Sequence, residues 1–378
     1  NLFKSNQIEP LVEALAVAVD CQKLSPLEEV NLVVQSQGMA SWVALQLADR
    51  MGIWANSNIW FPRRFFNHVL QITLREDPDV QDFFDRENLI WPIVDLLHEL
   101  LPRDEFLPLR HYLKGDTRSI KKYQLCHRLA QMFDQYLAFR PEMLLEWEKK
   151  SGENWQQLLW QKLVERSDNP HLAARTKNLF EQAQGANWSP FQHGVFLFGI
   201  STLPPLYLRI LNEMGTHVPV FLFCLTPSEE YWVQTESRGR NDSEELWEKG
   251  HPLLASLGKV GREFQELLIE NIDKIDMETD LFQANLNPHV LGRLQRDILQ
   301  LTSPRTLGGE ISDHQEAHPS IQLNICHGAL REVEVLHQHL LHLLHSGFVS
   351  VPDEIAVLAP KMEVYAPLIE AVFPDDPK

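Results

Sequence analysis

Asn31-Leu-Val-Val-Gln-Ser-Gln-Gly-Met-Ala-Ser-Trp42 is the stretch of the chain that decides its fold. It opens with a short apolar run rich in β-branched residues, Leu32 to Val34, and a polar segment follows. Beyond that segment apolar side chains recur at helical spacing as far as Met51, and Gly52 can end a helix there. The pattern predicts a buried parallel strand that passes through a tight loop into a helix.

Three polar side chains of this stretch, Gln35, Gln37 and Ser41, would lie near the carboxyl end of the strand. Ligands of open α/β sheets bind at such edges, and a glutamine amide both donates and accepts hydrogen bonds. These residues could therefore read a base edge or contact a phosphate oxygen. An ordinary strand-to-helix corner with polar residues facing water is the alternative, and the stretch alone leaves it open.

The length of 378 residues predicts two or three domains, and an apolar content of 44% is ordinary for a globular protein. The chain has neither a long apolar run nor a basic and apolar signal sequence, so we expect no membrane span and no secretion. The cysteines are scattered without a C-x-x-C pair, which is typical of free thiols in a reducing cytoplasm. They are Cys21, Cys126, Cys224 and Cys326.

The formal net charge of -18 repels nucleic acid overall. Because lysine and arginine neutralise phosphates, any nucleic-acid site must be a local basic region. The most basic region lies within residues 77–187, which read as helices; the strongest helix is expected over 119–139 and ends before Pro141. Its basic residues form either a solvated face or the contact face of a helical insert. They are Lys114, Arg118, Lys121, Lys122, Arg128 and Arg140.

Two places where a nucleotide-binding sheet carries its chemistry lack the required residues. A first strand, predicted at Leu2 to Lys4, leads into a helix without the G-x-x-x-x-G-K-[ST] motif that cradles phosphates. A later strand, expected within residues 194–201, ends in Gly-Ile-Ser-Thr instead of the Asp-Glu that holds magnesium in helicase-type NTPases. The sequence therefore predicts a nucleotide-binding type of sheet with no catalytic site and no cofactor.

Residues 59–68 interleave aromatic side chains, Phe61 among them, with Arg63 and Arg64. Stacking faces beside cations are what a single-stranded nucleic acid requires. A buried core is the commoner place for an aromatic stripe, although two arginines are harder to bury than their neighbours. Both interpretations stay open at this point.

A fresh unit is expected after a linker over residues 301–320. It comprises a strand at 321–326, a helix at 330–344 and a second strand at 355–358. Four histidines on the helix are more simply explained as a solvated face than as a metal site, so we expect no metal. Since the chain ends soon after the second strand, we expect the sequence to be a piece of a longer protein.

Five stretches resemble the N-terminal part of the RecC family, the gamma subunits of bacterial exodeoxyribonuclease V, which is also called the RecBCD complex. Each stretch is weak alone, but the five occur in the family's order and span nearly the whole chain. They are Val34-Gln-Ser-Gln-Gly-Met-Ala-Ser-Trp42, Phe133-Asp-Gln-Tyr-Leu137, Gly199-Ile-Ser-Thr-Leu-Pro-Pro205, Pro252-Leu-Leu-Ala-Ser256 with Gly258-Lys259, and Arg331-Glu-Val-Glu-Val-Leu-His337.

The resemblance implies an α/β fold with the P-loop NTPase-like parallel sheet of a degenerate superfamily 1 helicase. Core domain 1A would comprise residues 1–80 and 188–317, an inserted all-helical domain 1B residues 81–187, and the beginning of core domain 2A residues 321–378. The implied function is that of a non-catalytic, cytoplasmic DNA-binding subunit in double-strand-break repair and recombination. It would hold RecB-like and RecD-like motors in a heterotrimer, meet duplex DNA ends and channel unwound single strands.

The resemblance also implies that one channel reads the Chi sequence on the 3′-ended strand. Residues carried over by motif come from three of the segments above, and Arg63 and Arg64 join them on physical grounds. The reading surface would comprise Gln35, Gln37, Ser41, Phe61, Arg63, Arg64, Asn67, Gln131, Met132, Asp134 and Arg140. Ser41, Asn67 and Gln131 stand where familiar members carry glutamine, tryptophan and aspartate, so the chain would read an altered signal or none.

Two other classes of function remain open. A self-sufficient ATP-dependent helicase, or an AddB-like relative, would hydrolyse ATP in response to single-stranded DNA. An acidic scaffold that binds only proteins would show no single-strand binding at low salt, and neutralising Arg63, Arg64 and Arg140 would change nothing.

Overall fold

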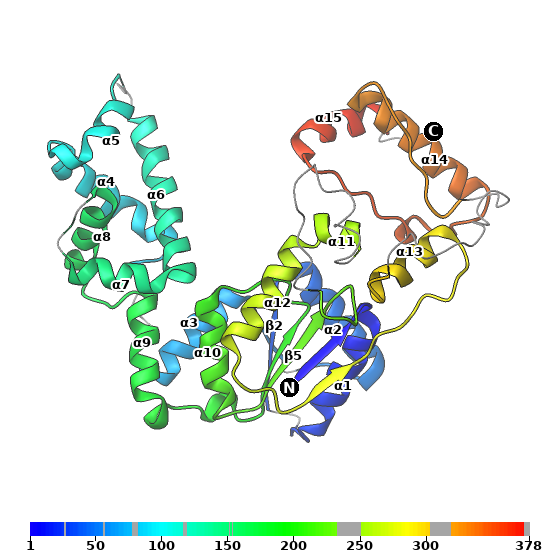
Figure 1. Cartoon of the computed structure of the whole chain (residues 1–378), viewed down its shortest axis with the longest axis horizontal. Coiled ribbons are helices and arrows are strands. Elements are labelled where there is room, and N and C mark those ends of the chain that lie inside the picture. The colour runs from blue at the N-terminus through cyan, green and yellow to red at the C-terminus, as the bar shows by residue number, and fades with distance from the viewer. Residues whose placement is uncertain are drawn as a thin grey trace. The chain divides into compact units, whose positions relative to one another are not determined.

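A computed structural model describes residues 1–25, 28–55, 57–77, 82–115, 119–150, 152, 154–232, 251–302 and 319–373. The chain divides into two compact units, whose elements are labelled in Figure 1. Unit 1 comprises Asn1–Asn285 and Gln295–Gly308, and unit 2 comprises Leu286–Leu294 and Gly309–Lys378. None of the helices within the described ranges has the length and apolar content needed to cross a lipid bilayer.

Unit 1 contains a sheet of six parallel strands in the order β3-β2-β4-β5-β1-β6, of which β2 and β5 are labelled in Figure 1. The strands are β1 (Leu2–Ser5), β2 (Val30–Val34), β3 (Ser57–Trp60), β4 (Val195–Phe198), β5 (Val220–Leu225) and β6 (Glu278–Asp280). The central strands are continuous apolar runs, because a parallel sheet is covered on both faces. The predicted α/β class with a parallel sheet is confirmed.

Helices cover both faces of this sheet. Helices α1 (Ile8–Cys21) and α2 (Gln37–Met51) pack on one face, and α3 (Pro62–Thr73), α10 (Pro205–Gly215) and α12 (Lys259–Asn271) pack on the other. A short helix, α11 (Pro252–Leu257), precedes α12. Along β4 the side chains alternate: Phe196 and Phe198 enter the core with α1 and α2, whereas Val195 and Leu197 enter the core with α3 and α10. The two cores are therefore separated by the sheet itself.

The corner from β2 to α2 folds as its sequence predicts. Ser36 caps α2, because its Oγ accepts a hydrogen bond from the Met39 N–H at 3.2 Å. Gly52 follows the last residue of the helix with a φ of 80°, a conformation that other residues rarely adopt.

Between α3 and β4 the chain forms a group of helices with a core of its own, in which Leu97, Phe133 and Trp160 are fully buried. Its members are α4 (Arg86–Leu100), α5 (Leu107–Tyr112), α6 (Ile120–Phe139), α7 (Pro141–Lys149), α8 (Trp155–Arg166) and α9 (Leu172–Gln182), with 3-10 turns at Asp104–Phe106, Ala183–Gly185 and Ser189–Phe191. The helix predicted over 119–139 is thus confirmed as α6. Pro141 begins α7, where its missing N–H is not needed.

Unit 2 differs from the expectation. Helix α14 (Ala329–His345) confirms the predicted helix, and a 3-10 turn at Pro352–Glu354 and α15 (Met362–Val372) follow it. The strands predicted at 321–326 and 355–358 are wrong, because neither segment pairs with another strand. A strand needs a neighbouring backbone for its hydrogen bonds, and the described part of unit 2 supplies none. Leu323 and Ile325 consequently remain exposed.

Helix α13 (Val290–Leu299) lies across the boundary between the two units. The linker predicted over residues 301–320 has only its two ends within the described ranges.

Candidate nucleic-acid interface

Gln35 follows β2 at the carboxyl edge of the sheet, beside the end of the neighbouring strand β4. These strands are neighbours, but the helix after β2 packs on one face and the helix after β4 on the other. Open α/β sheets bind ligands where the connections part in this way. Gln35 joins the segments that follow the two strands, because its Nε2 donates to the Thr202 carbonyl at 3.3 Å and its Oε1 accepts from the Ser201 hydroxyl at 3.0 Å. Its side chain is still exposed to a ligand.

Gln37 and Ser41 are exposed on α2, four residues apart and therefore on the same side of the helix. Their side chains make no hydrogen bond to any residue that the structure describes. Gly199, at the end of β4, has a φ of 63°, and a Cβ there would come within 3.3 Å of Met39 Cε. Glycine thus lets the end of β4 approach the first turn of α2, beside the predicted reading residues.

Phe61 follows β3 and lies at the same edge. Parallel pairing sets Trp60 opposite Val33, so Phe61 and Gln35 both leave the sheet at its carboxyl end on neighbouring strands. Phe61 is half-buried and packs against the core of α1 and α2. The next two phenylalanines, Phe65 and Phe66, are fully buried on the opposite side of the sheet, so most of the aromatic stripe is core.

Arg63 joins α3 to the group of helices. Its Nη1 lies 2.9 Å from Asp134 Oδ1 on α6, and its Nη2 lies 3.2 Å from Oδ2 of Asp85, the cap of α4. Burial raises the pKa of Asp134 above its ordinary value, although the Arg63 charge opposes this shift. Arg63, Asn67 and Asp134 line one cavity of about 210 Å³. The structure therefore brings together predicted residues that are about seventy positions apart in the sequence.

Asn67 accepts a hydrogen bond from Arg175, and Arg175 also forms an ion pair with Glu76. The sequence pattern did not lead us to either contact. Arg175 on α9 donates from Nη1 to Asn67 Oδ1 at 3.4 Å and binds both carboxylate oxygens of Glu76, at 3.0 and 2.5 Å. The Arg175 side chain is only 11% exposed. The sequence does contain a pattern that indicates this pair. Arg175 occurs at helical spacing from the apolar Leu172 and Leu179, and an arginine on an apolar stripe needs a partner.

Tyr207 on α10 completes the cavity and was also missed. Its ring stacks on Phe66 with 4.2 Å between centroids, and burial raises its pKa to about 12. Asp82 lines the same cavity, and burial raises its pKa as well. No periodic or motif signal in the sequence marks either residue as part of a site.

The remaining predicted residues do not line this cavity. Met132 is half-buried and packs against the core of the helical group, and its Sδ accepts a hydrogen bond from Gln156 Nε2 at 3.5 Å. Two residues along a helix turn by roughly 200°, so Met132 and Asp134 lie on different sides of α6. Gln131, Arg64 and Arg140 are exposed, and within the described ranges neither arginine makes an ion pair.

The turn from β1 to α1, where a phosphate loop would lie, is short and already hydrogen-bonded. Only two residues separate the strand from the helix. Asn6 Nδ2 donates to the Gln283 carbonyl at 2.9 Å, and Asn6 Oδ1 accepts from the Gln283 N–H at 2.9 Å. Ser5 Oγ donates to the Leu281 carbonyl at 3.0 Å and accepts from the Gln7 N–H at 3.1 Å. This turn joins β1 to the segment after β6.

A family model and several related proteins all match this chain to the same family. A family model described as "RecC, N-terminal domain" matches residues 1–301. The chain is 31% identical to the RecBCD enzyme subunit RecC of Escherichia coli (strain K12), with 100% of the chain and 38% of that protein covered. For the RecC subunits of Haemophilus influenzae and Mycolicibacterium smegmatis the identity is 29%, over 98% and 99% of the chain. The alignments cover 39% and 34% of those two proteins, so the chain spans well under half of each relative's length.

Proposed function

Because the chain belongs to the RecC family, we propose that it guides an unwound DNA strand within a RecBCD-type helicase-nuclease and hydrolyses no ATP itself. Its partners would be RecB-like and RecD-like motor subunits, together with duplex DNA ends and the single strands released from them. The complex as a whole would be an ATP-dependent exodeoxyribonuclease in double-strand-break repair and recombination.

The proposed fold is a superfamily 1 helicase core that has lost its ATP site. Core domain 1A would comprise residues 1–80 and 188–317, helical domain 1B residues 81–187, and residues 321–378 would begin core domain 2A. The division is supported by the helices with their own core that interrupt the parallel sheet. The loss of the ATP site is supported by the β1–α1 turn, where Asn6 and Ser5 already bind the segment after β6. A P-loop needs free backbone N–H groups at this turn to cradle phosphates.

The observation that carries the proposal is the ion pair from Arg63 to Asp134. It fixes α3, which begins at the carboxyl edge of the sheet, against α6 of the helical group. Side chains from both segments surround one cavity, while Gln35 and Phe61 leave the same edge on neighbouring strands. A strand that ran along this edge would meet exposed amides first and charged groups next, which suits the reading of a Chi-like sequence on the 3′-ended strand.

The signal read would differ from that of familiar members. Asn67 offers no indole face, and its amide oxygen is already engaged by Arg175. Ser41 and Gln131 supply a hydroxyl and an amide where glutamine and aspartate are expected. Each change of this kind alters base discrimination by about 1–3 kcal/mol.

A binding experiment with two exposed arginines tests the proposal. Fluorescence anisotropy of a labelled oligothymidylate of about 20 nucleotides would be measured with the unmodified chain and with the double variant Arg64→Gln/Arg140→Gln. We expect weaker binding and a slope of log K against log salt that is shallower by about 1.4, since each neutralised phosphate contributes about 0.7.

The matched control is Lys23→Gln/Lys149→Gln, which removes the same charge from exposed positions after α1 and at the end of α7. Equal losses in both double variants would mean that net charge alone controls binding, and the proposed interface would be rejected. ATP hydrolysis stimulated by the oligonucleotide would instead favour the helicase alternative.

A further inference from the structure

The hollow between α5 and α6 exposes aromatic side chains that the proposed interface does not use. Its volume is about 600 Å³, and Tyr112 of α5 and Tyr123 of α6 are among the residues that line it. Their exposed fractions are 54% and 47%. Trp91 on α4 is 65% exposed, with 6.2 Å between its ring centroid and that of Tyr123. Single exposed apolar residues are ordinary, but several large rings together mark a surface that binds something.

This surface is basic in an acidic chain. Among the described positions of residues 107–133 there are five lysines and arginines and no aspartate or glutamate, whereas the whole chain has a net charge of -18. Lys121 and Arg128 are exposed, lie two turns apart on one side of α6, and form no ion pair with the residues that the structure describes. Arg128 lines the hollow, Lys121 and Trp91 lie outside its lining, and no aspartate or glutamate is among the described residues that line it.

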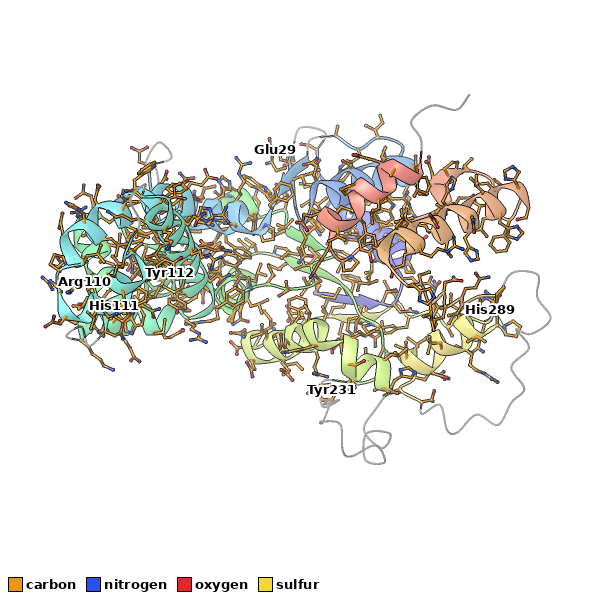
Figure 2. The ribbon with its side chains drawn as sticks, turned by 90° about the horizontal axis from the view of Figure 1, so that it is seen from above. Glu29, Arg110, His111, Tyr112, Tyr231 and His289 are labelled. Carbon is orange, nitrogen blue, oxygen red and sulfur yellow. The ribbon has the colours of Figure 1, made fainter. Side chains whose placement is uncertain are left out.

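Helix α5, which forms one side of the hollow, is hydrogen-bonded to the segment at the end of α4. The Arg110 guanidinium donates three hydrogen bonds, to the carbonyl oxygens of Leu101, Pro102 and Arg103, at 2.9, 3.0 and 2.7 Å. These bonds fix α5 to the end of α4, and Tyr112 lies only two residues further along (Figure 2). A ring on a fixed backbone loses little conformational freedom when a ligand stacks on it. Arg110 is therefore a structural residue, and the ligand contacts fall to its neighbours.

We propose that this hollow, the α5–α6 groove, is a second contact for a nucleic-acid strand. Bases would stack on Tyr112 and Tyr123, and phosphates would lie against Lys121 and Arg128. A single strand offers planar apolar faces and regular negative charge together, which matches both features of the groove. An acidic protein segment would match the charge but leave the exposed rings without a function. The inference relies on the proposed function only in that the chain meets a DNA strand, since it uses none of the sheet-edge residues.

The test separates stacking from charge with two probes. One is a labelled oligothymidylate of about 20 nucleotides, and the other is the same phosphodiester without bases. For the whole chain carrying Tyr112→Leu/Tyr123→Leu, we expect the Kd for oligothymidylate to rise by at least about fivefold, while the Kd for the abasic strand stays within about twofold. For Lys121→Gln/Arg128→Gln, we expect weaker binding of both probes and a salt slope shallower by about 1.4.

Other results of these binding experiments would overturn one or both proposals. If the tyrosine variant binds oligothymidylate as the unmodified chain does, or loses both probes equally, the groove does not stack bases and the inference is overturned. Loss only in Lys121→Gln/Arg128→Gln would indicate a surface for acidic polymers in general, and would also overturn it. If Arg64→Gln/Arg140→Gln binds normally while the tyrosine variant does not, the proposed interface fails and the groove stands. No binding by the unmodified chain would end both proposals.

Discussion

The junction between α3 and α6 and the edge of the sheet carry predicted reading residues in opposite physical states. At the junction, Arg63 and Asp134 are partly buried and form an ion pair. At the edge, Gln37 and Ser41 are exposed, and their side chains form no hydrogen bond with the residues that the structure describes. A substitution at the junction therefore changes the folded state as well as any ligand contact. Only the edge residues can report binding by itself, so the two regions call for different measurements.

The largest change in stability is expected when Glu76 loses Arg175, the arginine that also binds Asn67. Arg175→Met would leave Glu76 without its bidentate partner, and we expect the free energy of unfolding to fall by about 3 kcal/mol. Urea unfolding followed by circular dichroism measures it. The matched control is Lys177→Met on the same helix, whose pair with Glu181 is more than half exposed, so a change below about 0.5 kcal/mol is expected. Similar losses in both variants would show that the partly buried Arg175–Glu76 pair stabilises the fold no more than an exposed pair does.

The next effect depends on pH. Burial opposes ionisation of Glu148, but hydrogen bonds from His171 and Trp160 outweigh it and lower its pKa below the ordinary value of 4.5. A lowered pKa stabilises the folded state above that ordinary value, and the contribution is lost as pH falls through the folded-state value. Glu148→Gln should therefore lower the urea midpoint at neutral pH and converge with the unmodified chain in acid. Glu146→Gln, at an exposed position of the same helix, should show no such convergence.

At the sheet edge the first test concerns the start of α2, the helix that carries Gln37 and Ser41. Ser36→Ala removes the cap of α2, and we expect a loss of about 1 kcal/mol in the free energy of unfolding. Because Gln37 begins α2, oligothymidylate binding should weaken along with stability. A stability loss without any change in binding would show that the first turn of α2 is not part of the interface.

The smallest change in stability is expected for Gln37→Ala/Ser41→Ala. Both positions are exposed, so the free energy of unfolding should stay within about 0.5 kcal/mol, while the affinity for single-stranded DNA falls. Thermal unfolding and anisotropy on the same samples measure the two quantities. Unchanged affinity would remove α2 from the proposed interface and leave the junction alone.

The sequence predicted those elements whose signals are local. The β2–α2 corner has an apolar run, a capping Ser36 and a terminal Gly52 within one short stretch. The edge strands were not predicted, because their signals come from partners: β6 is entirely polar and is fixed by Lys4, whose Nζ lies 2.6 Å from Glu278. The same physics explains the wrong strands in unit 2, where apolar segments have no described neighbour to pair with.

The candidate site was predictable only in part. Gln35 and Phe61 follow strands, and the rule that ligands bind at carboxyl edges places both at one edge. The pairing of Arg63 with Asp134 joins distant segments, and no periodicity within either segment reports it. Met132 was assigned to the reading surface; it is half-buried against the core of the helical group, and its sulfur accepts a hydrogen bond from Gln156 of α8.

The central claim is that this chain holds a DNA strand passively, and one titration tests it most directly. Binding of oligothymidylate would be followed from about 50 to about 200 mM salt, with and without magnesium and ATP. The account predicts an affinity that falls steeply with salt and is the same with and without nucleotide. An affinity that shifts when ATP is added, or no measurable binding at the lowest salt, would contradict it.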